Sequence, residues 1–237
     1  MSDDHAHSHR SPRVLGVDAT RKGWVGIVLD TDGAFVDALV KPDIASLVEA
    51  AGRLSVVAID IPIGLPDAGA RQADSEARKM LGGRHSSVFS SPTRGAMEAD
   101  GYATAAAAQR AATGKGLTVQ TWGLKEKLME VDRWVQAGPS VRVVEVHPEV
   151  SFVAMKGSPL RASKHSWTGQ TERRELLAAA GIDIPTELGD AGKCAVDDVL
   201  DAAAAAWSAL RVRIGTANRL PDPPEMFSDG LASAIHF

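Results

Sequence analysis

Carboxylates occur at the ends of two apolar runs, where an acidic side chain needs a partner. Asp18 closes the run RVLGVD, and Asp60 closes the run LSVVAID just before Ile61 and Pro62. A buried carboxylate is costly unless it is paired, hydrogen-bonded or bound to a metal. For either residue alone, a turn cap or a hydrogen bond to loop amides is as good an explanation as metal binding. The two positions together make a shared metal site the hypothesis of interest.

Further acids lie in the segment AVDDVLDAAAAAWSALRVRIG, which is typical of a long helix that ends at Gly215. Asp198 and Asp201 are three residues apart, and Asp197 and Asp201 are four apart, so at least two carboxylates share one helical face. Asp197 is readily explained as a helix-start residue that the macrodipole stabilises. Asp201 lies inside the first turns and is the hardest of the three to explain as a cap. The adjoining alanines would let this helix pack closely on a sheet.

Several carboxylates within a few ångströms cannot all stay ionised without a cation, because each raises the pKa of the others. Ligands that are all oxygen favour Mg²⁺ or Mn²⁺. Two such ions about 4 Å apart support the in-line displacement at phosphorus that hydrolyses a phosphodiester. The hypothesis is a metal site with Asp18, Asp60 and Asp201 as direct ligands, completed by Asp198 or Glu145.

The elements that would position these residues follow from hydrophobic patterning. Three strand-like runs (13–18, 24–30 and 34–40) come first, and Asp32-Gly33 between the last two indicates a hairpin, so we expect an antiparallel meander. A capped helix over 43–52 precedes the buried strand 54–60, and VRVVEVHPE predicts a fifth strand that Pro148 closes. Strands four and five, each after a helical crossover, can then run parallel to a central first strand. Asp18, Asp60 and one of Glu145 or Glu149 would gather at one edge.

Helical and loop-like sequence, with helices at 75–81, around 103–112 and at 124–135, fills the segment from 64 to 138, a helical insertion between strands four and five. Its Gly-rich loops carry basic and aromatic residues that could hold phosphates or stack a base: Arg84, His85, Arg94, Lys115, Trp122 and Lys125. Near the proposed edge, Lys164, His147 and Glu149 could orient water or contact phosphate. Solvated loops, a core aromatic and loop anchoring are the competing explanations. A helix over 171–181 follows, and the Pro-rich tail after Gly215 predicts a return loop with a short final segment.

Composition limits the class of protein. The 237 residues are 44% hydrophobic with a formal net charge of −4, so the whole surface is not a nucleic-acid footprint. Cys194 is the single cysteine, which excludes an internal disulfide and fits a reducing, cytoplasmic compartment. No apolar run approaches the roughly 20 residues of a membrane span, and no signal peptide is indicated. Residues 1–12 predict a disordered tail, whose His5, His7 and His9 could scavenge a metal.

An ordered string of sequence blocks is similar to the family called domain of unknown function 429, described as predicted nucleases of ribonuclease-H-like fold. The blocks run through most of the chain: GVDATRKGWV, IDIPIGLP, ADSEARKMLGGRHSSVFSSPTRG, GLTVQTWGLKEKLMEVD, VEVHPEVSF and DDVLDAAAAA. The last block also resembles the helix of RuvC-type junction resolvases, which implies roles for Asp198 and Asp201, with Asp18 and Asp60 as the strand acids. Resolvase-like enzymes generally have Glu at the fourth-strand position, where this chain has Asp60.

We therefore expect an α/β protein with one ribonuclease-H-like domain over 13–237, a mixed five-stranded sheet and flanking helices. The expected activity is metal-dependent phosphodiester hydrolysis on a nucleic acid or nucleotide. Asp18, Asp60, Glu145, Asp198, Asp201 and Lys164 are the expected catalytic residues. Two alternatives remain: a nucleotide-dependent phosphotransferase of actin-like or sugar-kinase type, which would need two such units where one is seen, and a non-catalytic binding protein of the same fold. The oligomeric state is open, with a homodimer as one option.

Overall fold

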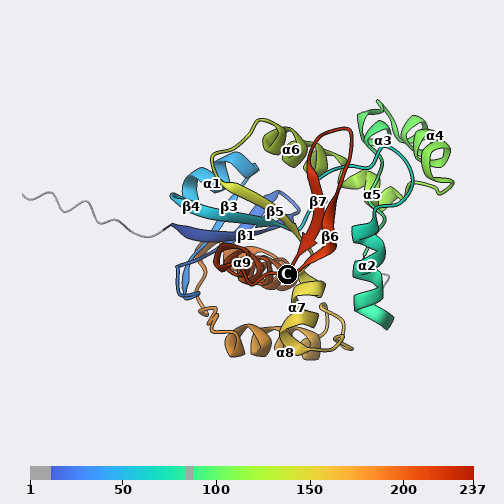
Figure 1. The fold of residues 1–237 in the computed structure, drawn as a ribbon. Helices are drawn as coiled ribbons and strands as arrows, with labels where there is room; N and C mark the ends of the chain where they lie inside the picture. Colours follow the sequence, from blue (N-terminus) through green and yellow to red (C-terminus); the bar gives the residue numbers. More distant parts are fainter. Residues whose placement is uncertain (1–11, 84–87) are drawn as a thin grey trace, which may run out of the picture.

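A seven-stranded mixed sheet forms the centre of the computed structural model, which describes residues 12–83 and 88–237 (Figure 1). The strand order is β3-β2-β1-β4-β5-β7-β6. Predictions for residues 1–11, and for Arg84 and His85, lie outside the described residues. The strands are β1 (Arg13–Thr20), β2 (Gly23–Leu29), β3 (Phe35–Lys41), β4 (Leu54–Ile59), β5 (Arg142–Val146), β6 (Arg219–Met226) and β7 (Ala232–His236).

The expected antiparallel meander is confirmed, with β1 pairing to β2 and β2 to β3. In the hairpin between β2 and β3, Gly33 has a φ of 91°, and the Asp30 carboxylate accepts hydrogen bonds from the Asp32 and Ala34 amides. β4 runs parallel to β1, and β5 parallel to β4, also as expected. β1 continues two residues beyond Asp18, so this aspartate lies within the strand and not at its last position.

The prediction of five strands is wrong, because the C-terminal segment adds two more. β7 pairs parallel to β5, and β6 pairs antiparallel to β7 at the edge of the sheet. The Pro-rich segment was expected to be a return loop. Pro221, Pro223 and Pro224 instead lie in β6, an edge strand, where a missing backbone N–H is tolerated.

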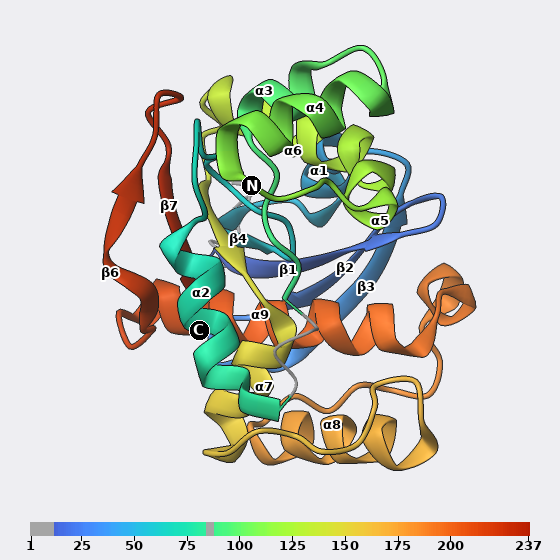
Figure 2. The ribbon, with the colours of Figure 1, turned by 90° about the vertical axis from the view of Figure 1, so that its right-hand side faces the viewer.

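Helices cover both faces of the sheet. α1 and α6 lie on one face, while α9 lies against the other with α7 and α8 beyond it (Figures 1 and 2). The predicted cap of α1 is confirmed, since the Asp43 carboxylate accepts a hydrogen bond from the Ser46 amide. α7 was not predicted, although Pro148 at its first turn and Glu149 beside it are typical of a helix start. The described helices are α1 (Ile44–Ala51), α2 (Gln72–Leu81), α3 (Arg94–Glu98), α4 (Tyr102–Thr113), α5 (Val119–Gly123), α6 (Lys125–Gln136), α7 (Pro148–Lys156), α8 (Trp167–Ala179), the 3₁₀ helix η2 (Gly189–Lys193) and α9 (Val196–Ile214).

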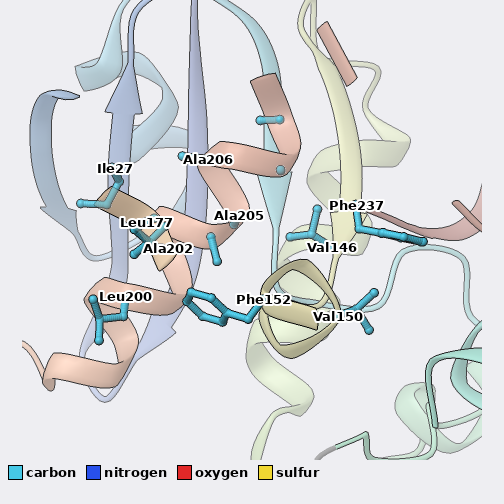
Figure 3. Close-up of a cluster of buried hydrophobic side chains, with 14 of the residues drawn as sticks. Ile27, Val146, Val150, Phe152, Leu177, Leu200, Ala202, Ala205, Ala206 and Phe237 are labelled. Carbon is cyan, nitrogen blue, oxygen red and sulfur yellow. The ribbon is translucent and has the colours of Figure 1, made fainter. Parts of the chain in front are cut away.

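Two hydrophobic cores lie on the two faces of the sheet. The core under α9 contains the alanines of this helix together with apolar residues of α7 and α8, and Figure 3 shows Phe152 of α7 pointing toward α9. The opposite core joins the sheet to α1 and α6. Within the described part of the chain, no helix has the length and apolar character needed to cross a membrane.

Candidate metal centre

Asp18, Asp60 and Asp201 meet in space. Each offers one carboxylate oxygen, and these three atoms all lie within 4.8 Å of one another. Asp18 comes from β1, Asp60 directly follows β4, and Asp201 comes from the first turns of α9. The predicted convergence of these three residues is therefore confirmed. A cluster of this size and composition can hold a divalent cation.

Strand alternation explains why the two strand acids share a face. Successive side chains of a strand point to opposite faces, so Asp18 lies on the same face as Gly16, and Asp60 on the same face as Ala58. Gly16 contacts α9, and Ala58 belongs to the core under α9. Because β1 and β4 are parallel neighbours, both carboxylates emerge side by side under the start of that helix.

The close approach of α9 to β1 brings in the third acid. A Cβ atom added to Gly16 would lie 1.9 Å from the Ala206 nitrogen and 2.2 Å from the Ala202 oxygen, so the two backbones are in direct contact. Ala202 and Ala206 are themselves fully buried. The expectation that small residues let this helix pack tightly is confirmed, and the packing places Asp201 over the two strand acids.

The three carboxylates of the cluster have too little positive charge around them to stay ionised. Burial, followed by repulsion from Asp60 and Asp201, raises the pKa of Asp18 well above its usual range. Burial also raises the pKa of Asp60 and the pKa of Asp201, each to about 7, although Lys164 opposes both shifts. One lysine is therefore insufficient to keep the carboxylates ionised at neutral pH.

Lys164 is the cation that the chain supplies. Its Nζ donates to Asp201 Oδ2 at 2.5 Å and lies 3.7 Å from Asp197 Oδ2. Burial lowers the pKa of Lys164, but attraction to Asp201, Asp60 and Asp18 outweighs it, and the net pKa is raised. Lys164 is thus a fixed positive charge at the cluster, consistent with its predicted place beside the site.

One buried oxygen of the cluster lacks a partner. Asp201 is 1% exposed, and its Oδ1 makes no hydrogen bond to any of the residues described. Leaving a buried acceptor unsatisfied is costly, and native structures usually explain such an atom by a ligand, an ion or water. An oxygen-only donor set with an unsatisfied buried carboxylate fits Mg²⁺ or Mn²⁺.

The other two acids of α9 lie toward solvent. Asp198 is half-buried and lies outside the group of three that can share an ion. Its pKa is raised by burial and then by Asp197. Asp197 lies 3.2 Å from His165 Nδ1 as well as near Lys164. These residues form the outer margin of the centre.

Glu145 faces the opposite side of the sheet from the triad. Its neighbours Val144 and Val146 belong to the core under α9, so alternation turns Glu145 away from it. Its Oε2 accepts from Arg71 Nη2 at 2.6 Å and from the Ile63 amide at 2.7 Å. Glu145 therefore does not complete the triad as expected, because it belongs to a buried ion pair instead.

Glu149 lies beside the cluster but is held by an arginine. Its Oε1 accepts from Arg173 Nη2 at 2.5 Å and from Arg173 Nε at 3.2 Å. Arg173 is fully buried in α8 and also donates to the Gly169 carbonyl of the same helix, so its bonds to Glu149 tie α7 to α8. Sequence analysis missed Arg173, since nothing in TERRELL distinguishes a buried arginine from a solvated one. His147 occupies the N-cap position of α7.

Most of the described basic and aromatic residues predicted to hold substrate in the insertion are engaged in protein contacts. Arg94 binds Asp132 through both terminal nitrogens and Asp229 through Nη2. Lys125 Nζ donates to the Ala99 carbonyl and lies 4.7 Å from the Trp122 ring. Trp122 in turn packs edge-on against Tyr102. These contacts give Arg94, Lys125 and Trp122 structural roles. Lys115, in contrast, is exposed and lines a cavity.

The raised pKa values predict that the free energy of unfolding falls between about pH 4 and pH 7 when a chelator removes metal. In this window the folded Asp60 and Asp201 hold protons that the unfolded chain has released, so the folded state is favoured at the acidic end and that advantage is lost as pH rises. The contribution is on the order of several kcal/mol, because a pKa difference of one between the folded and unfolded chain corresponds to about 1.4 kcal/mol. Urea denaturation at pH 5 and pH 8 measures it.

The matched comparison for this pH effect is Asp201→Asn, which removes one of the titrating groups and should flatten the pH dependence. Asp183→Asn changes an exposed aspartate and should leave the dependence as in the original chain. Equal slopes for the Asp201→Asn variant and the original chain would contradict the assignment.

Comparison with known proteins finds one family. A family model described as "Protein of unknown function (DUF429)" matches residues 16–226, a span that includes Asp18, Asp60 and Asp201. The search of curated proteins found no match. The search of solved structures likewise found none.

Proposed function

The chain belongs to the DUF429 family of proteins of unknown function, and we propose that it is a divalent-metal-dependent nuclease of ribonuclease-H-like fold. The observation that carries the proposal is the meeting of three carboxylates from β1, the end of β4 and α9 within 4.8 Å. The antiparallel meander followed by the parallel strands β4 and β5 supports the fold assignment, with residues 13–237 as one domain.

Asp18, Asp60 and Asp201 would hold Mg²⁺ or Mn²⁺, and Asp198 at the solvent side would complete the site. A bound ion of this type supplies Lewis-acid polarisation of a phosphoryl oxygen and activation of the attacking water. The chain contributes the fixed geometry. The two strand acids are held by the sheet, and Asp201 is held by the packing of α9 on Gly16.

Lys164 gives the centre an affinity for phosphate. In this structure its ammonium group lies on Asp201, at the side of the cluster that carries the half-buried Asp197 and Asp198. With an ion held by the acids, Lys164 would remain at this side of the cluster, where its ammonium group would be close to a phosphate drawn to the site. We therefore assign Lys164 to orienting the phosphodiester and stabilising its developing charge.

Titration with Mn²⁺ by calorimetry at neutral pH tests the proposal. We expect saturable binding to the original chain and its loss in both Asp18→Asn and Asp201→Asn. Asp183→Asn, at an exposed position, should bind as the original chain does. Absence of Mn²⁺ and Mg²⁺ binding by the original chain would overturn the proposal.

The same titration separates the alternatives. If no ion binds, the centre would be metal-free and held by the close Lys164–Asp201 pair, which is the non-catalytic alternative. Tight ATP binding by a chain that shows no nuclease activity would instead indicate the phosphotransferase. Because each class predicts a different ligand response, parallel titrations with Mn²⁺ and ATP distinguish them.

A further inference from the structure

A polar cavity, lined by none of Asp18, Asp60 and Asp201, lies in the helical segment between β4 and β5. It has a volume of about 270 Å³ and is bounded by the loop before α2, residues 89–91, α4 and the chain leading into α5. These helices group together on one side of the molecule (Figures 1 and 2). The volume falls below the roughly 300 Å³ at which pockets for drug-sized ligands begin, so it suits a single small molecule or one unit of a polymer.

Gln109 provides a hydrogen-bond donor in this cavity. Its side chain is 4% exposed, and its Oε1 accepts from the Thr93 amide at 2.8 Å and from Thr93 Oγ1 at 3.1 Å. The Thr93 amide can only donate, so the amide oxygen of Gln109 must point to it and Nε2 must point the other way. Nε2 has no hydrogen-bond partner among residues 12–83 and 88–237. Nε2 is not among the fully buried atoms that lack a partner, so it is a donor on the cavity wall that a ligand acceptor can reach.

The other buried polar side chains of the cavity are satisfied within the protein. Ser91 Oγ bonds to Asp74, and Thr121 Oγ1 bonds to Thr118 Oγ1 at 2.8 Å. Gln109 is therefore the group among them that is left to select a ligand. The other lining residues indicate which further chemical groups a ligand would carry.

Phe89 and Leu117 supply apolar lining, and the Phe89 ring is partly exposed. Aromatic rings bind flat π-systems by stacking. Lys115 also lines the cavity and is exposed, and it makes no ion pair with any described residue. The site thus combines a flat apolar contact, one donor that the protein leaves unused and one available cation.

We infer that this cavity binds one nucleotide unit, with a base carbonyl oxygen accepting from Gln109 Nε2, the base against Phe89, and a phosphate at Lys115. The chemical class is a nucleotide whose base carries a carbonyl group, as in uracil or guanine. This inference rests on the proposed nuclease function, for which the cavity would select a base of the substrate.

Binding of uridine and adenosine monophosphates, measured by calorimetry in the presence of a chelator, tests the inference without the metal centre. We expect uridine monophosphate to bind at least about tenfold more tightly than adenosine monophosphate. Adenine has no carbonyl oxygen to accept from Gln109 Nε2, and a tenfold change in affinity corresponds to about 1.4 kcal/mol, within the range of one hydrogen bond. Gln109→Glu keeps an acceptor for Thr93 and replaces the donor by an oxygen, so it should abolish this preference. Lys115→Ala should weaken both nucleotides about equally, and Lys193→Ala, which changes an exposed lysine of η2, should change neither.

Failure of uridine monophosphate to bind the original chain would overturn the inference, as would an unchanged preference in Gln109→Glu with native circular dichroism. If Gln109→Glu does not fold, the preference of the original chain and the effect of Lys115→Ala decide the matter. Mn²⁺ titration of the same samples reports separately on the acidic triad. Nucleotide binding without Mn²⁺ binding would refute the proposed nuclease and leave the cavity assignment standing.

Discussion

Asp201→Asn is expected to lower the rate of metal-dependent phosphodiester hydrolysis on the order of 10³-fold. Asp201 is the most buried of the three acids and the only one of them with a buried oxygen lacking a partner among the residues described. Replacing that carboxylate with an amide removes a charged ligand, and an active-site ion contributes several kcal/mol of transition-state stabilisation. Cleavage of labelled single-stranded and duplex DNA and RNA in Mn²⁺ measures the effect.

Asp197→Asn is the matched control for this experiment. It makes the same change one helical turn away, at a residue that contacts Lys164 and His165 but lies outside the group of three. We expect its activity to remain within about tenfold of the original chain, as for an outer residue of a metal site. Equal activity of Asp201→Asn and the original chain would exclude the triad as the centre of hydrolysis.

The positions of the triad could be predicted because local signals fixed each member. Asp18 and Asp60 each close an apolar run of sequence, and the topology that places two parallel strands side by side follows from the hairpin and the helical crossover. Asp201 lies in the first turns of an alanine-rich helix, which the structure packs against Gly16. The three positions could therefore be predicted from short stretches of sequence, together with the general rule for how parallel strands are connected.

The predictions that were wrong concern residues whose contacts come from distant parts of the sequence. Glu145 lies in a strand buried on both faces, so its neighbours do not reveal which face it joins, and its partner Arg71 is 74 residues away. Arg94 resembled a free cation because its partners Asp132 and Asp229 belong to α6 and the β6–β7 connection. The edge position of β6, which makes its prolines acceptable, is likewise a property of the whole sheet.

Gly16 is the residue on which the geometry of the centre depends. We expect Gly16→Ala to lower the free energy of unfolding by about 3 kcal/mol or more. The added methyl group would meet backbone atoms of Ala202 and Ala206 at 1.9–2.2 Å, and rotation of a side chain cannot relieve that overlap. The helix must move away from β1, which separates Asp201 from Asp18. We therefore expect a melting temperature at least about 6 °C lower and weakened Mn²⁺ binding together. Gly95→Ala makes the same substitution in α3 with open space around the new atom, so it should retain both properties. Native stability and native Mn²⁺ binding in Gly16→Ala would show that the contact between β1 and α9 does not set the position of the third acid.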